Sequence, residues 1–293
     1  MKTISLVGLA GAAVMAMTAA TTSAQAADLG GLRKGSIKDG YVAPVREAMA
    51  PAGNCYFRAD VGYSFARDPK ATWPVSNIDI DAGGNYTYTY IGDQVSTINV
   101  DNVPFGGVGL GCGSGSRGIR GEFMLNHYGW RGYDGRPQEF VITDASGGPG
   151  TMGEDPVHTR IRSTTAMFNA YYDLGQFGRF TPYVGAGVGV AHNRTDEAYF
   201  TENPYLLNRI QGGSRLALAW SLMAGVGVQV SDRAIIDVGY RFTDLGKAET
   251  GRVDNAGFIN PAVKFDELRN HEVRVGLRYH FGSSDCCASV PMK

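Results

Sequence analysis

The clearest pattern in the chain is an alternation of apolar and polar residues in its last regular stretch. In HEVRVGLRYHF, residues 271–281, the odd positions from Val273 onward are apolar, and the even positions carry glycine or ionisable side chains. Successive side chains of a β-strand point to opposite sides, so a repeat of two residues predicts a strand with two unlike faces.

Seven other segments share this period and are separated by connections of two kinds. The segments are FRADVGYSF (57–65), GGVGLGC (106–112), IRGEFMLNHY (119–128), AMFNAYY (166–172), PYVGAGVGVA (182–191), LALAWSLMAGVGVQV (216–230) and AIIDVGYRF (234–242). The connections are short at 114–116, 173–180 and 231–233, and long at 67–102, 129–157, 193–214 and 244–270. Alternating short turns and long loops indicate an antiparallel meander of the kind that spans membranes.

The direction of the apolar face decides between a soluble barrel or sandwich, with this face inward, and a transmembrane barrel. Glycines and ionisable residues share the polar face, which suits a crowded interior better than a solvent face. Aromatic residues collect near strand ends, as in the two girdles of membrane barrels. A tilted eleven-residue strand rises roughly 28 Å, about the thickness to be crossed. We therefore expect an all-β, eight-stranded antiparallel up-and-down transmembrane β-barrel that closes on itself, since lipid tolerates no unpaired sheet edge.

The first residues indicate export. Lys2 precedes an apolar run from Ile4 to Met17, and Ala24-Gln25-Ala26 forms an A-x-A cleavage site, a pattern that favours a secretory signal peptide over an anchor helix. The expected organisation is a signal peptide (1–26) cleaved near Ala26, a flexible periplasmic lead-in (27–54), the barrel (55–281) and a C-terminal tail (282–293). No later apolar run is long enough for a spanning helix.

The charge balance of the exported chain gives no sign of a nucleic-acid partner. With Lys2 removed, 26 basic side chains face 28 acidic ones. A near-neutral balance gives no electrostatic reason to expect binding to nucleic acid.

The signal peptide, YYDLGQFGRFTPYVGAGVGVAHN (171–193) and the closing VRVGLRYHF (273–281) resemble the small opacity-type and OmpA-like surface proteins of Gram-negative bacteria. The surface antigens of alphaproteobacteria are the most similar group, and the resemblance covers most of residues 55–281. It implies an outer-membrane location and a C-terminal aromatic residue, here Phe281, that the barrel-assembly machinery reads. The family commonly ends at that residue, whereas GSSDCCASVPMK follows here.

A set of ionisable residues falls on the polar face of the predicted strands. Its members are Arg58, Asp60, Arg120, Glu122, Asp237, Arg241, Glu272, Arg274 and Arg278. Isolated charges in a narrow lumen are costly, whereas paired charges are tolerated. An eight-stranded interior is about filled by side chains, so we expect a salt-bridged plug; the alternative is a charged pore.

Four cysteines in an exported chain invite disulfides. Cys55 and Cys112 fall at the same end of neighbouring strands and in the same register, which predicts a disulfide between them; the alternative is two free thiols. Cys286 and Cys287 lie in the tail, and adjacent cysteines bridge each other poorly, so links between chains are an option for them.

Other motifs carry less chemistry. GSGSRG (113–118) matches a dinucleotide-binding pattern, but a strand rather than a helix follows it. NYTYTY (85–90) alternates in the first long loop and suggests either a hairpin with tyrosines for adhesion or a loop packed on itself. His127 has no adjacent serine to activate, and no histidine–cysteine–carboxylate cluster has metal-site spacing.

These observations favour a non-enzymatic outer-membrane surface protein without cofactor, metal or catalytic residues, with a role in envelope integrity or in contacts through its loops. The alternatives are a small porin and, less favoured, a lipid-modifying enzyme. Expected partners are outer-membrane lipid, the barrel-assembly machinery and a surface ligand of the loops.

Overall fold

The structure is a computed structural model that describes residues 54–113, 117–135, 138–143, 151–154, 157–200, 209–251, 253–255, 258–260 and 262–281. The expected signal peptide, all of the lead-in except Asn54, the turn at 114–116 and the tail with Cys286 and Cys287 lie outside these residues. In the described part of the chain no helix has the length and apolar character needed to cross a membrane.

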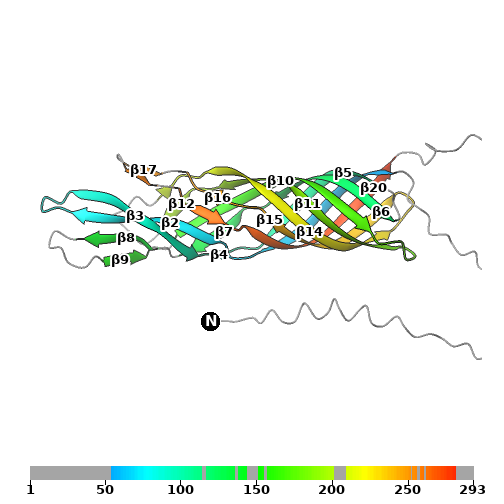
Figure 1. Ribbon diagram of the computed structural model, residues 1–293, viewed down its shortest axis with the longest axis horizontal. Helices are drawn as coiled ribbons and strands as arrows, with labels where there is room; N and C mark the ends of the chain where they lie inside the picture. Colours follow the sequence, from blue (N-terminus) through cyan, green and yellow to red (C-terminus); the bar gives the residue numbers. More distant parts are fainter. Residues whose placement is uncertain are drawn as a thin grey trace, which may run out of the picture. The chain divides into compact units, whose positions relative to one another are not determined.

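Eight antiparallel strands form a closed barrel (Figure 1). In chain order they are β1 (Cys55–Ala66), β5 (Val103–Gly113), β6 (Gly118–Tyr128), β10 (Val157–Asp173), β11 (Phe180–Thr195), β14 (Ser214–Gln229), β15 (Ala234–Asp244) and β20 (Arg269–Phe281). Each pairs with the next, and β20 pairs with β1 from Cys55–Phe281 to Ala66–Asn270. The predicted fold class is confirmed.

The apolar face of the barrel points outward. Val61 and Phe168 are about two-thirds exposed, at 67% and 68%, whereas Arg58 and Asp237 are fully buried. Apolar side chains gain nothing from contact with water, so a wall of exposed Val, Leu and Phe around a charged interior is built for lipid.

Most barrel strands continue further toward the long loops than the sequence pattern indicated, and β10 does so by the most residues. The alternation in AMFNAYY predicts a strand over 166–172, but β10 runs from Val157 to Asp173. Its added part buries Thr159 and Ser163 and turns Arg160 outward. Beyond the lipid the outward face is polar, and the inward face mixes the apolar Val157 and Ile161 with Thr159 and Ser163. The alternation of apolar and polar residues is therefore lost there, while the backbone pairing continues.

The long connections form a second, smaller sheet beyond the barrel. β2 (Lys70–Ile80) and β3 (Tyr86–Thr97) make a hairpin, and β2 also pairs in parallel with β8 (Gln138–Thr143), which pairs with β9 (Thr151–Glu154). β16 (Ala248–Glu249) and β19 (Lys264–Asp266) complete this sheet. β2, β3, β8 and β9 extend to the left of the barrel in Figure 1. Of the two arrangements considered for NYTYTY, the structure shows the hairpin, in which Tyr86–Tyr90 belong to β3.

Short strands complete the long-loop end. They are β4 (Asn99–Val100), β7 (Arg131–Gly135), β12 (Ala198–Phe200), β13 (Arg209–Ile210), β17 (Val253–Asn255) and β18 (Phe258–Asn260). β7 and β12 pair with the extended part of β10, β13 pairs with β12, and β17 and β18 form a separate hairpin.

Candidate functional site in the barrel interior and at its outer end

Glycines on the inward face make room for the charged side chains. A Cβ atom added to Gly276 would lie 1.9 Å from Asp60 Oδ1, and one added to Gly227 would lie 2.6 Å from Arg278 Nη2. Gly111 gives space in the same way to the ring of Tyr56. These close approaches explain why glycine and ionisable residues share one face of the strands.

Arg58 is the centre of the interior network. Its guanidinium lies 2.8 Å from Asp60, 3.3 Å from Glu122 and 3.6 Å from Asp237. These carboxylates come from β1, β6 and β15, on different parts of the barrel wall. One cation therefore links strands that are not neighbours in the sheet, across the lumen.

Three further arginines complete the charge pairing around this centre. Arg278 donates to both oxygens of Asp237 at 2.5 and 2.9 Å, and Arg274 donates to Asp60 at 3.1 Å. Arg120 donates from Nε to Asp173 at 3.0 Å. Such charge-assisted contacts with well-defined geometry are what makes buried ions tolerable.

Tyrosine hydroxyls satisfy the remaining acceptors of Glu122. Tyr56 donates to Oε2 at 3.0 Å and Tyr171 donates to Oε1 at 2.9 Å. Tyr56 in turn accepts a hydrogen bond from Arg120 Nη1 at 3.2 Å. All members of this central network are buried, so water does not screen the interactions among them.

A second ion pair lies nearer the long loops. Arg241 donates from Nε to Glu272, and the Tyr128 hydroxyl donates to the other oxygen of Glu272 at 2.8 Å. Arg241 also donates to Tyr128 at 3.2 Å and to Asn126 at 3.3 Å. This group spans β6, β15 and β20 and fills the lumen above the central network.

The structure places all nine ionisable residues predicted for the interior inside the barrel, and it adds two that the sequence reasoning missed. Asp173 pairs with Arg120 and balances the five predicted arginines with a fifth carboxylate. It lies two residues after the inward-facing Tyr171, so extending the alternation of AMFNAYY by one residue would have found it. Arg131 is also buried, and it donates to Asn270 and Ser64 at 2.8 and 3.0 Å.

An apolar cluster of buried residues lies at the long-loop end of the barrel. Trp73 of β2, Phe265 of β19 and Tyr133 of β7 pack together, with ring centroids 6.5 Å apart for Trp73–Phe265 and 5.6 Å for Tyr133–Phe265. The cluster continues to Phe105 and Met167 on the barrel wall. We call this cluster the outer plug. The alternation of apolar and polar residues did not predict the outer plug, because Trp73, Tyr133 and Phe265 come from three different long connections.

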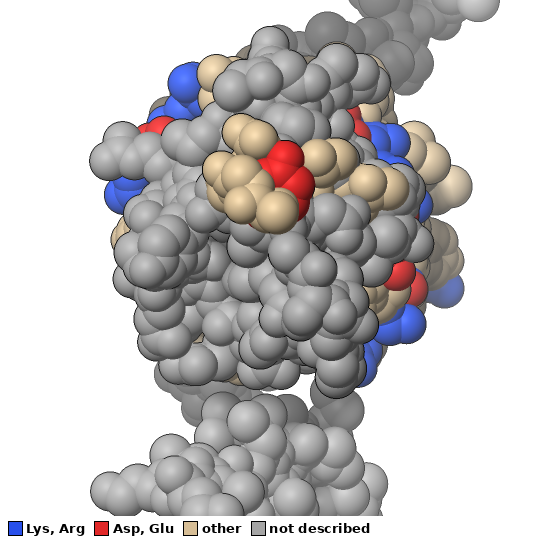
Figure 2. Space-filling view, turned by 90° about the vertical axis from the view of Figure 1, so that its left-hand side faces the viewer, with Lys and Arg blue, Asp and Glu red and all other residues tan. Residues whose placement is uncertain are grey.

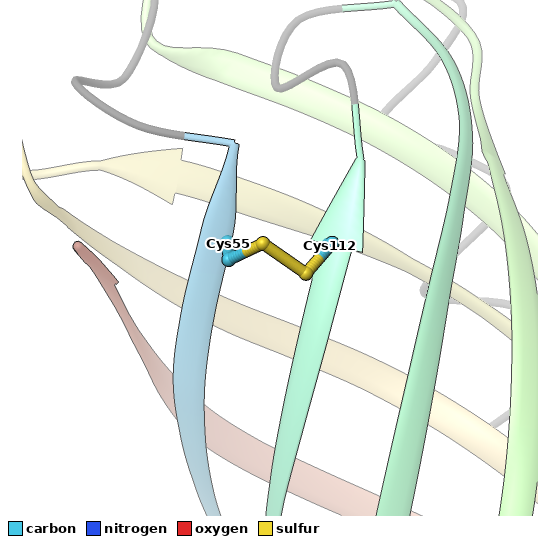
Figure 3. Close-up of a disulfide and its surroundings, with 2 residues drawn as sticks. All are labelled: Cys55 and Cys112. Atoms are coloured by element: carbon cyan, nitrogen blue, oxygen red, sulfur yellow. A yellow bond between two sulfur atoms is a disulfide. The ribbon is translucent and has the colours of Figure 1, made fainter. Parts of the chain in front are cut away.

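A disulfide joins Cys55 and Cys112 at the turn end of β1 and β5 (Figure 3). The two residues are direct partners in the β1–β5 register, with Cα atoms 4.0 Å apart. Cys55 is also the register partner of Phe281 in β20. The crosslink therefore lies beside the seam at which the barrel closes, and Phe281 is the last residue of that seam.

The histidines are dispersed. His127 Nδ1 lies 2.9 Å from Thr164 Oγ1, His158 pairs with Asp134, and His271 Nδ1 lies 2.6 Å from the Tyr240 hydroxyl. His192 is exposed on β11, and His280 is buried against the Tyr56 ring. Within the described ranges, no group of three or more histidine, cysteine or acidic side chains could hold a metal ion.

Known proteins similar to this chain agree with this architecture. The family described as "Outer membrane protein beta-barrel domain" matches residues 80–281. An uncharacterized protein of Brucella abortus is 30% identical over 249 residues, which cover 77% of this chain and 84% of the relative. Outer membrane protein PagN of Salmonella typhimurium is 32% identical over 145 residues, 47% of this chain and 60% of PagN.

A protein of Rickettsia bellii whose name marks it as a candidate adhesin is 26% identical over 118 residues, 40% of this chain and 52% of that protein. The family match covers most of the barrel, from the tip of β2 to the last residue of β20. The chain therefore belongs to the outer membrane β-barrel family, and its place is the outer membrane of a Gram-negative bacterium.

Proposed function

We propose that the protein is a non-enzymatic surface protein in which a closed barrel anchors an outer sheet that contacts material outside the cell. The observation that carries this proposal is the outer sheet itself. β2 pairs with β3 over its whole length and with β8 and β19 on its other edge. Long loops that only linked strands would need no such pairing.

The likeness to a candidate adhesin of Rickettsia bellii supports contact as the role of this sheet. Thr87 and Thr89 of β3 are exposed, and the described tip residues from Asp81 to Asn85 are exposed as well. A polar, paired and exposed surface is suited to binding at low cost in conformational entropy, because its backbone is already ordered.

The test of this proposal is to shorten the β2–β3 hairpin. Replacing Ser76–Ile91 by Asn-Gly keeps the paired residues Val75 and Gly92 and the plug residue Trp73 in register, and Asn-Gly suits a two-residue hairpin turn. We expect bacteria that express this variant to bind epithelial monolayers no better than bacteria with an empty vector, whereas wild-type cells bind above that level. Heat-modifiable gel migration checks that the barrel is folded.

The matched control removes the β17–β18 hairpin by replacing residues 253–260 with the same turn. This control also shortens a long connection but leaves β2, β3, β8 and β9 in place. Full binding by the shortened β2–β3 variant, or equal loss in both variants, would contradict the proposed role of the outer sheet.

The alternative of a small porin is tested by conductance. In the barrel six buried arginines, the five predicted ones and Arg131, accompany five buried carboxylates, and the outer plug lies above them. We expect the purified protein in planar bilayers to give no large, stable single-channel steps. Such steps would support the porin and contradict the closed anchor.

The alternative of a lipid-modifying enzyme is tested by mass spectra of lipid A. Spectra from bacteria with and without the protein are expected to be the same. A mass change that depends on the protein would show an enzyme instead.

A further inference from the structure

The outward faces of β10 and β11 change from apolar to cationic toward the long loops. On β10 the outward residues pass from Phe168 and Ala166 through Thr164 to Arg162 and Arg160. On β11 they pass from Val188 and Val190 to His192 and Arg194. Figure 2 views the molecule from this end, and the Lys and Arg side chains visible there lie mainly at the edge of the view.

The change occurs at the height where the outer leaflet ends. Tyr172 is an exposed aromatic residue at the turn end of β10, and Arg162 lies ten residues closer to the loops. A strand tilted by about 40° gains roughly 2.5 Å of height per residue. Arg162 therefore lies about 25 Å above Tyr172, which is the height of the apolar band of such barrels.

Arg162 and Arg194 face each other directly in the β10–β11 register. Like charges in opposite positions of two strands destabilise the pairing. Among the described residues, no ion pair joins Arg162 or Arg194 to a carboxylate. The nearby Asp196 and Asp134 are engaged by Arg160 and His158.

Some cations elsewhere near this end of the barrel have carboxylate partners. Arg269 lies 3.1 Å from Asp244, and Lys247 lies 2.8 Å from Asp266. The Arg162–Arg194 pair differs from these two cations in forming no ion pair within the described part of the chain, although Asp196, which Arg160 binds, is close enough to Arg194 to interact with it electrostatically. An anion that reaches both arginines would be attracted by their two positive charges.

Trp130 holds one of these guanidinium groups against the barrel wall. The Arg162 Cζ atom lies 4.5 Å from the centroid of the Trp130 ring, and Arg160 Cζ lies 5.4 Å from it. Tryptophan is enriched where membrane meets water, and stacking on a ring fixes the plane of a guanidinium group. Below this level, Phe168 and Val190 offer an apolar wall to acyl chains.

We propose that Arg162 and Arg194, with Trp130, form a binding site for the phosphate of a phosphorylated glycolipid in the outer leaflet. Guanidinium groups bind phosphate oxygens in pairs of hydrogen bonds. A lipid supplies both parts of the fit, because its phosphate reaches the two arginines while its chains lie against the wall below. The proposal does not depend on a role of the outer sheet in adhesion.

The test titrates detergent-purified full-length protein with diphosphoryl lipid A and follows bound lipid by native mass spectrometry. We expect the double variant Arg162→Gln, Arg194→Gln to bind about tenfold more weakly than the wild type, since charge-assisted hydrogen bonds to phosphate are lost. The matched control is Lys247→Gln, Arg269→Gln, which removes the same charge from cations that have carboxylate partners. Its affinity is expected to stay at the wild-type value.

Two further arms identify the ligand. Dephosphorylated lipid A should bind the wild type as weakly as diphosphoryl lipid A binds the double variant, and inorganic phosphate at the lipid concentration should not displace the lipid. Heat-modifiable migration shows that each variant is folded. Equal affinity of wild type and double variant, equal loss in the control, undiminished binding of the dephosphorylated lipid, or displacement by inorganic phosphate would each overturn the proposal.

Discussion

At the residue scale, Asp60 of β1 faces Gly276 of β20 across the seam that closes the barrel. The carboxylate occupies the space where any side chain at position 276 would begin. The same is true of Arg278 and Gly227. The interior network therefore depends on small residues beside the charged ones as much as on the charges themselves.

The variant Gly276→Val should destabilise the barrel, because its side chain would overlap Asp60. Overpacking of this kind costs about 1–3 kcal/mol or more, and displacing Asp60 also disturbs its contacts with Arg58 and Arg274. Gly121→Val is the matched control, since no atom lies within 4 Å of a Cβ added there. The folded fraction on unboiled gels measures both, and equal fractions would contradict the role of Gly276.

The variant Arg58→Leu removes the central cation and leaves three carboxylates without it. Breaking a buried ion pair typically costs about 3–5 kcal/mol in the free energy of unfolding. Arg160→Leu breaks the exposed pair with Asp196, where the expected cost is about 1 kcal/mol or less. Urea unfolding in lipid vesicles compares the two, and a similar small loss in both would show that the central network adds little stability.

At the element scale, the disulfide fixes the turn ends of β1 and β5, which are separated in the chain by the whole β2–β3 hairpin. Local alternation is enough to predict both strands. It is also enough to bring the two cysteines into register, because strands that follow one another in a meander are neighbours in the sheet. The pairing is thus a consequence of topology.

Removal of this crosslink by Cys55→Ser, Cys112→Ser should lower the free energy of unfolding by about 4 kcal/mol. The chain-entropy description gives this value for a closed loop with the observed sequence separation of 57 residues. Urea unfolding of the refolded protein measures it. The variant Cys286→Ser, Cys287→Ser serves as the control and is expected to unfold like the wild type; an equal stability of all three proteins would contradict the prediction.

The tip of the β2–β3 hairpin should loosen in acid. Asp81 accepts hydrogen bonds from the backbone N–H groups of Gly83 and Asn85 and from the Asn85 side chain, at 2.8–2.9 Å. The Asn85 contacts are the main reason that the pKa of Asp81 is held below its usual value of 3.8. A lowered pKa in the folded state means that this stabilisation is present above the usual value and is lost as pH falls through the lowered one.

Amide hydrogen exchange of Gly83 and Asn85 checks this prediction. In the wild type, protection should fall as pH drops below the usual Asp81 value, whereas in Asp81→Asn it should not change with pH. The same pH response in both proteins would show that another group titrates there.

The eight barrel strands could be predicted from sequence, because one face of each strand contacts lipid and the other faces a charged lumen. Apolar and polar residues therefore alternate along the strand with a period of two. The upper parts of β10, β11 and β14 and the outer sheet lack that contrast. The parallel pairing of β2 with β8 joins residues from different long connections, and no local pattern determines such a contact. Asp173 was missed for a simpler reason. It is the last inward residue of β10 and lies one residue beyond the alternating segment AMFNAYY.

At the scale of the whole molecule, the barrel has an apolar wall for lipid, a neutralised interior and an outer end built from its long connections. The apolar wall and the charged interior arise from residues of neighbouring strands that lie close to one another in the sheet register. The third depends on Trp73, Phe265 and Tyr133 meeting from three separate connections. The interior could therefore be predicted as a set of charges, and the outer plug could not.

We propose that the outer plug and the ionic network obstruct the lumen in series, one behind the other. Each of the two would block the lumen without the other, so a path for solutes opens only when both the outer plug and the ionic network have been removed. The variant Trp73→Ala should thus leave the bilayer as tight to ions as the wild type. A current in that single variant would mean that the arginines and carboxylates of the interior alone do not block ions. The large side chains of the outer plug would then be what makes the barrel impermeable.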